Sequence, residues 1–110
     1  MNINQQVTDL INIVPIVSIV SKTYSDSPYT AVIKNLIKYD CTSGNSIINL
    51  PTAVGNSNLT IVIKKIDISS NILTVNPNGT ETIDGQTNYA LGVQWETVTF
   101  ISDNTNWLVL

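Results

Sequence analysis

The sequence predicts an all-β fold, a small antiparallel β-sandwich of jelly-roll type behind an N-terminal arm. From residue 29 onward, short runs rich in Val, Ile and Thr are separated by turn-forming clusters at near-regular intervals. Within the runs, apolar residues recur at every second position, as in Leu59, Ile61 and Ile63, which places them on one face of a strand. These features are typical of a sandwich or barrel and not of βαβ units.

The turn signals divide this region into nine expected strands, near residues 29–33, 36–41, 46–50, 58–67, 72–76, 80–84, 87–92, 95–102 and 105–110. Turn residues supply either a positive φ or side-chain bonds to their own backbone. Asp84-Gly85 predicts one tight hairpin, and the stretch from Ser102 to Thr105 predicts another. The turn-defining residues are Gly55, Gly79, Asp84, Gly85, Asp103 and Asn104.

Several strands are apolar on both faces. Val62 and Ile66 lie opposite Ile61, and Trp95 lies opposite Val98. A second covering layer is therefore expected, and neighbouring copies in a closed three-fold assembly would provide part of it most simply. The residues expected in the core or in a subunit contact are Leu59, Ile61, Ile63, Val98, Phe100, Trp95 and Trp107.

Ahead of the patterned region, residues 1–22 predict a docking arm, and residues 23–110 the β-sandwich module. Apolar residues of the arm recur at helical spacing up to Pro15, which would end a helix. Asn, Thr, Val and Ile are mediocre helix formers, so an extended arm that pairs with the sheet edge of a neighbouring copy or protein is an equal alternative. The expected docking residues are Ile3, Val7, Leu10, Ile11, Val14 and Ile16.

Composition limits the partners. Charged residues make up 12% of the chain, about half the usual share, so part of the surface is expected to meet protein. Five lysines, no arginine and a net charge of −3 disfavour nucleic acid. The apolar run at residues 11–20 is too short and too interrupted for a membrane span and lacks the basic flank of a signal peptide. Cys41 is the only cysteine, so no internal disulfide forms and synthesis in a reducing cytoplasm fits.

The residue types argue against an enzyme. Without histidine there is no base for a nucleophilic triad, and without a cysteine pair there is no zinc ligand set. Lys64 and Lys65 are expected on a solvated strand face, which leaves a Ser/Lys pair only formally open. The acids Asp67, Asp84 and Asp103 are expected to cap turns. We therefore expect no catalytic residues, no metal and no cofactor.

Two alternatives remain from the polar and aromatic residues. Asp84 with Glu81 or Glu96 is the one carboxylate pair considered for glycoside hydrolysis. Exposed aromatic rings could stack on sugars, although burial in the core is the simpler expectation for them. The candidates are Trp95, Trp107, Tyr89, Tyr39, Tyr29 and Tyr24.

An ordered set of short motifs runs through the module: Leu50-Pro51-Thr52-Ala53, Gly55-Asn56, Ile63-Lys64-Lys65-Ile66-Asp67, Thr82-Ile83-Asp84-Gly85 and Ser102-Asp103-Asn104-Thr105-Asn106-Trp107. Over residues 29–110 this series resembles a small β-module of bacteriophage virion proteins, which usually reads LPxA…GN…IKKxD…TIDG…SDGTNW. Asn104 replaces the usual Gly, at a small expected penalty for left-handed geometry.

The resemblance implies a trimeric, non-enzymatic virion protein, made in the host cytoplasm, that serves as a capsid decoration or head-fibre component. Its partners would be copies of itself and virion proteins such as the major capsid protein, reached through the arm. The alternative is a tail-fibre or receptor-binding module that recognises host surface glycan.

Overall fold

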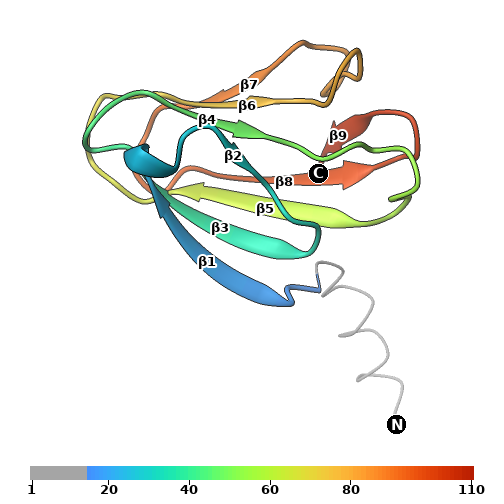
Figure 1. Cartoon of the computed structure of the whole chain (residues 1–110), viewed down its shortest axis with the longest axis horizontal. Helices are drawn as coiled ribbons and strands as arrows, with labels where there is room; N and C mark the ends of the chain where they lie inside the picture. Colours follow the sequence, from blue (N-terminus) through green and yellow to red (C-terminus); the bar gives the residue numbers. More distant parts are fainter. Residues whose placement is uncertain (1–14) are drawn as a thin grey trace, which may run out of the picture.

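The protein is a two-layered β-sandwich. The computed structural model describes residues 15–110, and Figure 1 shows the two sheets lying one over the other. The elements are β1 (Ser18–Thr23), the 3-10 turn η1 (Tyr24–Asp26), β2 (Tyr29–Thr30), β3 (Asn35–Asp40), β4 (Ser46–Asn49), β5 (Thr60–Lys65), β6 (Leu73–Asn76), β7 (Tyr89–Leu91), β8 (Thr97–Ser102) and β9 (Trp107–Val109). The all-β sandwich expected from the sequence is confirmed.

The sheets are mixed rather than antiparallel. One sheet has the strand order β1-β3-β5-β8-β9 and the other the order β2-β4-β6-β7. The expected antiparallel pairing holds for β5 with β8, β8 with β9 and β6 with β7. It is wrong for β1 with β3, β3 with β5, β2 with β4 and β4 with β6, which are all parallel.

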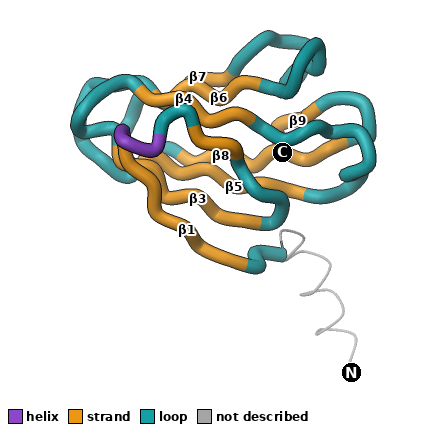
Figure 2. The backbone as a smooth tube through the Cα atoms, viewed as in Figure 1, coloured by secondary structure: helices purple, strands orange, loops and turns teal. Residues whose placement is uncertain are grey.

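The parallel pairs follow from how the chain winds. From β1 to β6 successive strands alternate between the two sheets. Within a sheet, each strand therefore lies beside the strand two before it in the chain, as β3 lies beside β1 and β4 beside β2. Each time the chain crosses to the other sheet and comes back, which we call one winding, the new strand runs in the same direction as the previous strand of that sheet. The two neighbouring strands are therefore parallel. A jelly roll, built from Greek keys, would bring neighbours back antiparallel instead. Figure 2 shows the loops of these windings gathered at the two ends of the sandwich.

Two strand predictions differ from the structure. No strand forms at residues 80–84, where only Ile83 makes isolated bridges, to Gln86 and to Trp107. Conversely, β1 lies in the segment assigned to the arm, and the expected boundary after residue 22 falls inside this strand. Its apolar residues alternate poorly, and its side chains are mostly exposed because β1 is the edge strand of its sheet.

The core lies between the two sheets. Alternate residues of β3, β5 and β8 point inward from the first sheet, and alternate residues of β4 and β6 point inward from the second. Tyr89 of β7 meets Phe100 of β8 edge to face, with ring centroids 5.7 Å apart, and so joins the two layers. Fully or almost fully buried core residues include Ile37, Tyr39, Ile48, Ile61, Ile63, Leu73, Val75, Leu91, Val98, Phe100 and Trp107.

Candidate functional site

The most polar part of the interior is a cluster around Lys65, at the end of β5. The side chain of Lys65 is completely buried. Its Nζ donates to the Asp67 carboxylate at 3.0 Å, to the Asp67 carbonyl at 3.1 Å and to the Ser69 carbonyl at 2.9 Å. All three donors of the ammonium group are therefore used, as a buried charge requires.

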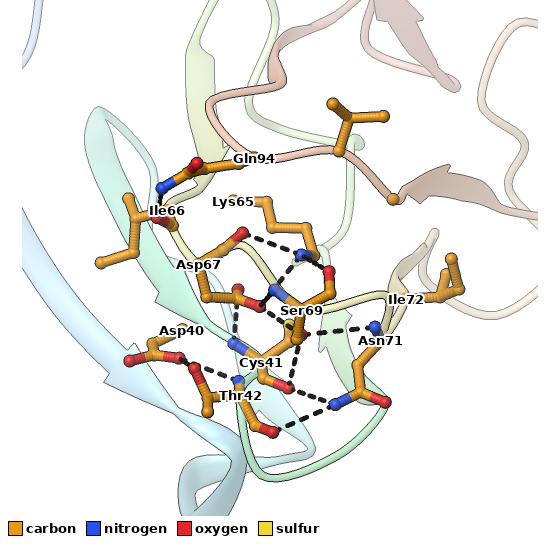
Figure 3. Close-up of polar contacts among 12 residues, drawn as sticks. Asp40, Cys41, Thr42, Lys65, Ile66, Asp67, Ser69, Asn71, Ile72 and Gln94 are labelled. Atoms are coloured by element: carbon orange, nitrogen blue, oxygen red, sulfur yellow. Dashed lines mark hydrogen bonds and ion pairs between the residues drawn. The ribbon is translucent and has the colours of Figure 1, made fainter.

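Asp67 connects this amine to the neighbouring windings, as Figure 3 shows. Its Oδ1 accepts from the backbone N–H of Cys41 at 2.7 Å, and its Oδ2 accepts from the backbone N–H of Ser69 at 3.1 Å and from the Ser69 hydroxyl. The Cys41 carbonyl accepts in turn from Asn71 Nδ2 at 2.8 Å. The cluster thus joins the end of β3 to the loop after β5.

Hydrogen bonding sets the charge state of the cluster. Burial alone would raise the pKa of Asp67, but the hydrogen bonds from Ser69 and Cys41, together with Lys65, outweigh it and lower the pKa to about 2. Burial raises the pKa of the Cys41 thiol and of the Tyr39 phenol. The carboxylate is therefore ionised and the thiol protonated near neutral pH.

This arrangement is suited to holding loops together rather than to chemistry. A lysine nucleophile needs a free, neutral amine, and a cysteine nucleophile needs an accessible thiolate; Lys65 is fully paired and Cys41 is buried. No pocket opens on the cluster, and residues 15–110 contain no group of three potential metal ligands.

The prediction of a solvated face was wrong for Lys65. Lys64 does lie on the outer face, where its Nζ reaches the Trp95 carbonyl at 3.2 Å and the Thr97 hydroxyl at 2.7 Å. Lys65 instead shares the inward face with Ile61 and Ile63. The sequence carried this signal, because strict alternation from Ile61 puts residue 65 on the buried side.

A second network lies at the opposite end of the sandwich, around the loop at residues 51–56. The carbonyl of Pro51 accepts from the indole N–H of Trp107 at 3.0 Å, and the carbonyl of Ala53 accepts from the Ser102 hydroxyl at 2.6 Å. The backbone N–H of Gly55 donates to Asn104 Oδ1 at 2.8 Å. The motif around residues 102–107 therefore binds the motif around residues 50–56.

The loop at residues 78–86 joins the same network. Glu81 accepts from the Thr52 hydroxyl at 2.7 Å and from the Ala53 N–H at 2.9 Å. Asn106 accepts from the Thr82 N–H, and Asp84 accepts from the Val109 N–H. These bonds involve the acids considered for glycoside hydrolysis, and each acid serves a backbone or hydroxyl partner of its own. Glu96, at the other end, caps the N–H groups of Gly92 and Val93.

The turn-defining residues adopt the special geometry that their types allow. Gly55, Gly79, Gly85, Asp84 and Asn104 all have positive φ. Asp84 and Gly85 form a two-residue turn closed by reciprocal bonds between Ile83 and Gln86, as expected of a tight hairpin. Asp103 bonds the N–H groups of Thr105 and Asn106, and these backbone bonds lower its pKa.

The expected core residues divide into two groups. Ile61, Ile63, Val98, Phe100 and Trp107 are buried, and Leu59 is half-buried. Trp95 is 58% exposed, so of the two roles expected for it, core or subunit contact, the structure excludes the core. It belongs to the turn that precedes β8 rather than to a strand, and the alternation of β8, in which Val98 and Phe100 point inward, also places residue 95 on the outer side.

The other aromatic candidates are mostly covered. Tyr39 is buried, Tyr29 and Tyr89 are half-buried against the core, and Tyr24 is exposed in η1. Of the expected docking residues only Ile16 is described, and it is exposed. Ile3, Val7, Leu10, Ile11 and Val14 lie outside the described residues.

No protein-family model and no curated protein matches this chain. Among residues 15–110, no helix has the length and apolar character needed to cross a membrane.

Proposed function

We propose that the protein is a non-enzymatic structural component of a bacteriophage virion, a capsid decoration or head-fibre subunit. It associates with copies of itself, most simply as a trimer, and is held on the particle through its N-terminal arm. Its partner there is a virion protein such as the major capsid protein, and the arm residues proposed to bind are Ile3, Val7, Leu10, Ile11, Val14 and Ile16.

The observation that carries this proposal is the role of the motif residues. The residues that resemble the virion module join loops of the fold. Trp107, Ser102 and Asn104 bind the loop at residues 51–56. Lys65 and Asp67 bind each other, and Asp67 binds the backbone at the end of β3. None of these groups is left free for catalysis. A motif set dedicated to loop geometry supports a scaffold role.

The surface provides further support. Many large apolar side chains of the described residues are exposed, including Val17, Ile19, Ile68, Val93 and Trp95. With charged residues at only 12%, the surface has little polar cover. Exposed apolar area of this kind favours permanent contact with protein.

The arm is the part to test by experiment. Leu10→Lys with Ile11→Lys is expected to abolish binding of the purified protein to particles that lack it, because two charges enter the proposed apolar contact. Gln5→Lys with Gln6→Lys is the matched control, since it adds the same charge at polar positions of the same arm and should leave binding unchanged. Cosedimentation with the particles measures both.

Two results would contradict the proposal. Equal binding by both variants would show that the arm does not dock. Binding of the parent protein to host cells, but not to particles, would support the receptor-binding alternative instead.

Any truncation of the arm should stop before residue 15, because β1 begins at Ser18.

A further inference from the structure

Trp95 occupies a backbone position that a bulky residue rarely adopts. Residues 93–96 form a turn in which the Glu96 N–H donates to the Val93 carbonyl at 3.1 Å. Trp95 is the third residue of this turn and has a φ of +68°. Glycine or asparagine is the usual residue at a third turn position with positive φ, because a larger side chain is strained there. An exposed tryptophan held in strain is a candidate for function.

The surrounding bonds hold Trp95 in this conformation. Its N–H donates to the Lys65 carbonyl at 2.7 Å, and its carbonyl accepts from Lys64 Nζ and, at 3.1 Å, from the Thr97 hydroxyl. Glu96 Oε1 accepts from the N–H groups of Gly92 and Val93. The backbone of the turn is thus fixed at both ends, and the Cα atom of Trp95 is held in place on the surface.

Two further apolar side chains are exposed in this turn and in the loop bonded to it. Val93, in the same turn, is 67% exposed, and Ile68, in the loop after β5, is 84% exposed. The two loops are joined by the bond from Gln94 Nε2 to the Ile66 carbonyl at 3.3 Å. In Figure 1 they lie at the end of the sandwich opposite the one where the described chain begins. We call Ile68, Val93 and Trp95 the apolar tip.

We propose that the apolar tip is a contact between copies of this chain, with Trp95 as its central residue. This rests on the self-association proposed above. Tryptophan is enriched among the residues that dominate protein interfaces. Lys64 and Glu96 flank Trp95 with opposite charges, and Glu96 Oε2 bonds to no described residue. The surface around the tip therefore carries both signs of charge, so that Lys64 of one copy can meet Glu96 of the next in a closed assembly.

Trp95→Gly separates binding from folding. Glycine relieves the positive φ, so the melting temperature is expected to stay equal to that of the parent or to rise. Loss of the indole is expected to raise the dissociation constant of the assembly at least about tenfold. Sedimentation equilibrium over a concentration series measures the mass, and thermal unfolding measures the fold. Trp95→Asn, which also tolerates positive φ, provides an independent second variant.

Val54→Ser is the matched control. Val54 is 58% exposed, as Trp95 is, but belongs to the loop at residues 51–56 at the other end of the molecule. Its replacement is expected to leave the mass of the assembly unchanged.

The outcomes distinguish the two proposals. A parent protein that is monomeric at tens of micromolar would refute self-association itself. A parent assembly that Trp95→Gly and Trp95→Asn leave intact would retain self-association but overturn the role of the tip. Dissociation by Val54→Ser to the same extent would also overturn it, because the effect would not then be specific to Trp95.

Discussion

Single residues in this protein act mainly on loops that are distant in sequence. Asn104 stands where the resembled module has glycine, and its positive φ alone would cost some stability. Its side chain, however, accepts a bond from the Gly55 N–H that glycine could not provide. The expected penalty is therefore offset by a contact that the sequence alone did not reveal.

Trp107 joins the core to the same loop. Its ring is fully buried and its indole N–H bonds the Pro51 carbonyl. Trp107→Ala is expected to lower the free energy of unfolding by about 3–5 kcal/mol, since it leaves a large cavity and an unpaired carbonyl. Urea denaturation measures the change. The exposed neighbour Leu108 is the control, and Leu108→Ala should cost less than about 1 kcal/mol. Equal losses would argue against the packing described for Trp107.

Asp67 predicts how stability depends on pH. Its pKa is about 2 in the folded protein, below the ordinary value of 3.8. Because folding lowers this pKa, the carboxylate stabilises the fold fully above about pH 4, and this contribution is lost as the pH falls through 2. The loss should reach about 2 kcal/mol. Urea denaturation at pH 5, 3 and 2 measures it, and Asp67→Asn should be less stable at pH 5 and show a flatter dependence. Parallel slopes for the two proteins would contradict the assignment.

Among the elements, β5 shows how far the alternation of apolar residues predicts which side chains of a strand are buried. The pattern from Leu59 to Ile63 correctly placed Ile61 and Ile63 inside. The same pattern places Lys65 inside, but the usual preference of lysine for water argued against it. In the structure the buried amine of Lys65 is paired with the Asp67 carboxylate and with two backbone carbonyl groups. These partners belong to the loop after β5, so the sequence of the strand alone does not reveal them.

The adjacent lysines of β5 give a matched experiment. Lys65→Met removes the buried counter-charge of Asp67 and is expected to destabilise the fold by about 3–5 kcal/mol. Lys64→Met affects a half-buried side chain on the outer face of the sheet and should cost less than about 1 kcal/mol. Chemical denaturation at neutral pH compares them. A loss of similar size in both variants would mean that Lys65 is not paired as described.

For the remaining elements, turn chemistry located most strands but not their partners. Gly, Asn, Asp and Pro clusters correctly located β3 through β9, because these residues limit the local backbone, but they also predicted a strand at residues 80–84 that does not form. Parallel pairing was not predictable in this way, since it depends on which sheet each successive strand joins. The strand β1 was missed because an exposed edge strand need not alternate, and the networks at the two ends join segments far apart in sequence.

The whole molecule has two chemically different ends. One is secured by the loops at 51–56, 78–86 and 103–106, and the described chain begins there; the other carries the Lys65 cluster and the apolar tip. The small share of charged residues predicted contact with other molecules. It did not predict where on the surface this contact lies, because composition says nothing about position. We propose that the contact is at the strained turn of Trp95, and the solution mass of the parent protein and of its Trp95 variants tests this proposal.

The hydrogen bond between the Trp107 indole and the Pro51 carbonyl also has a consequence for how the protein folds. Fifty-six residues separate its two partners, so this bond cannot form until Trp107 has been synthesised, whereas the bonds from Glu81 to the same loop can form earlier. Contacts between residues so far apart in sequence are the kind that slow the folding of β-rich chains.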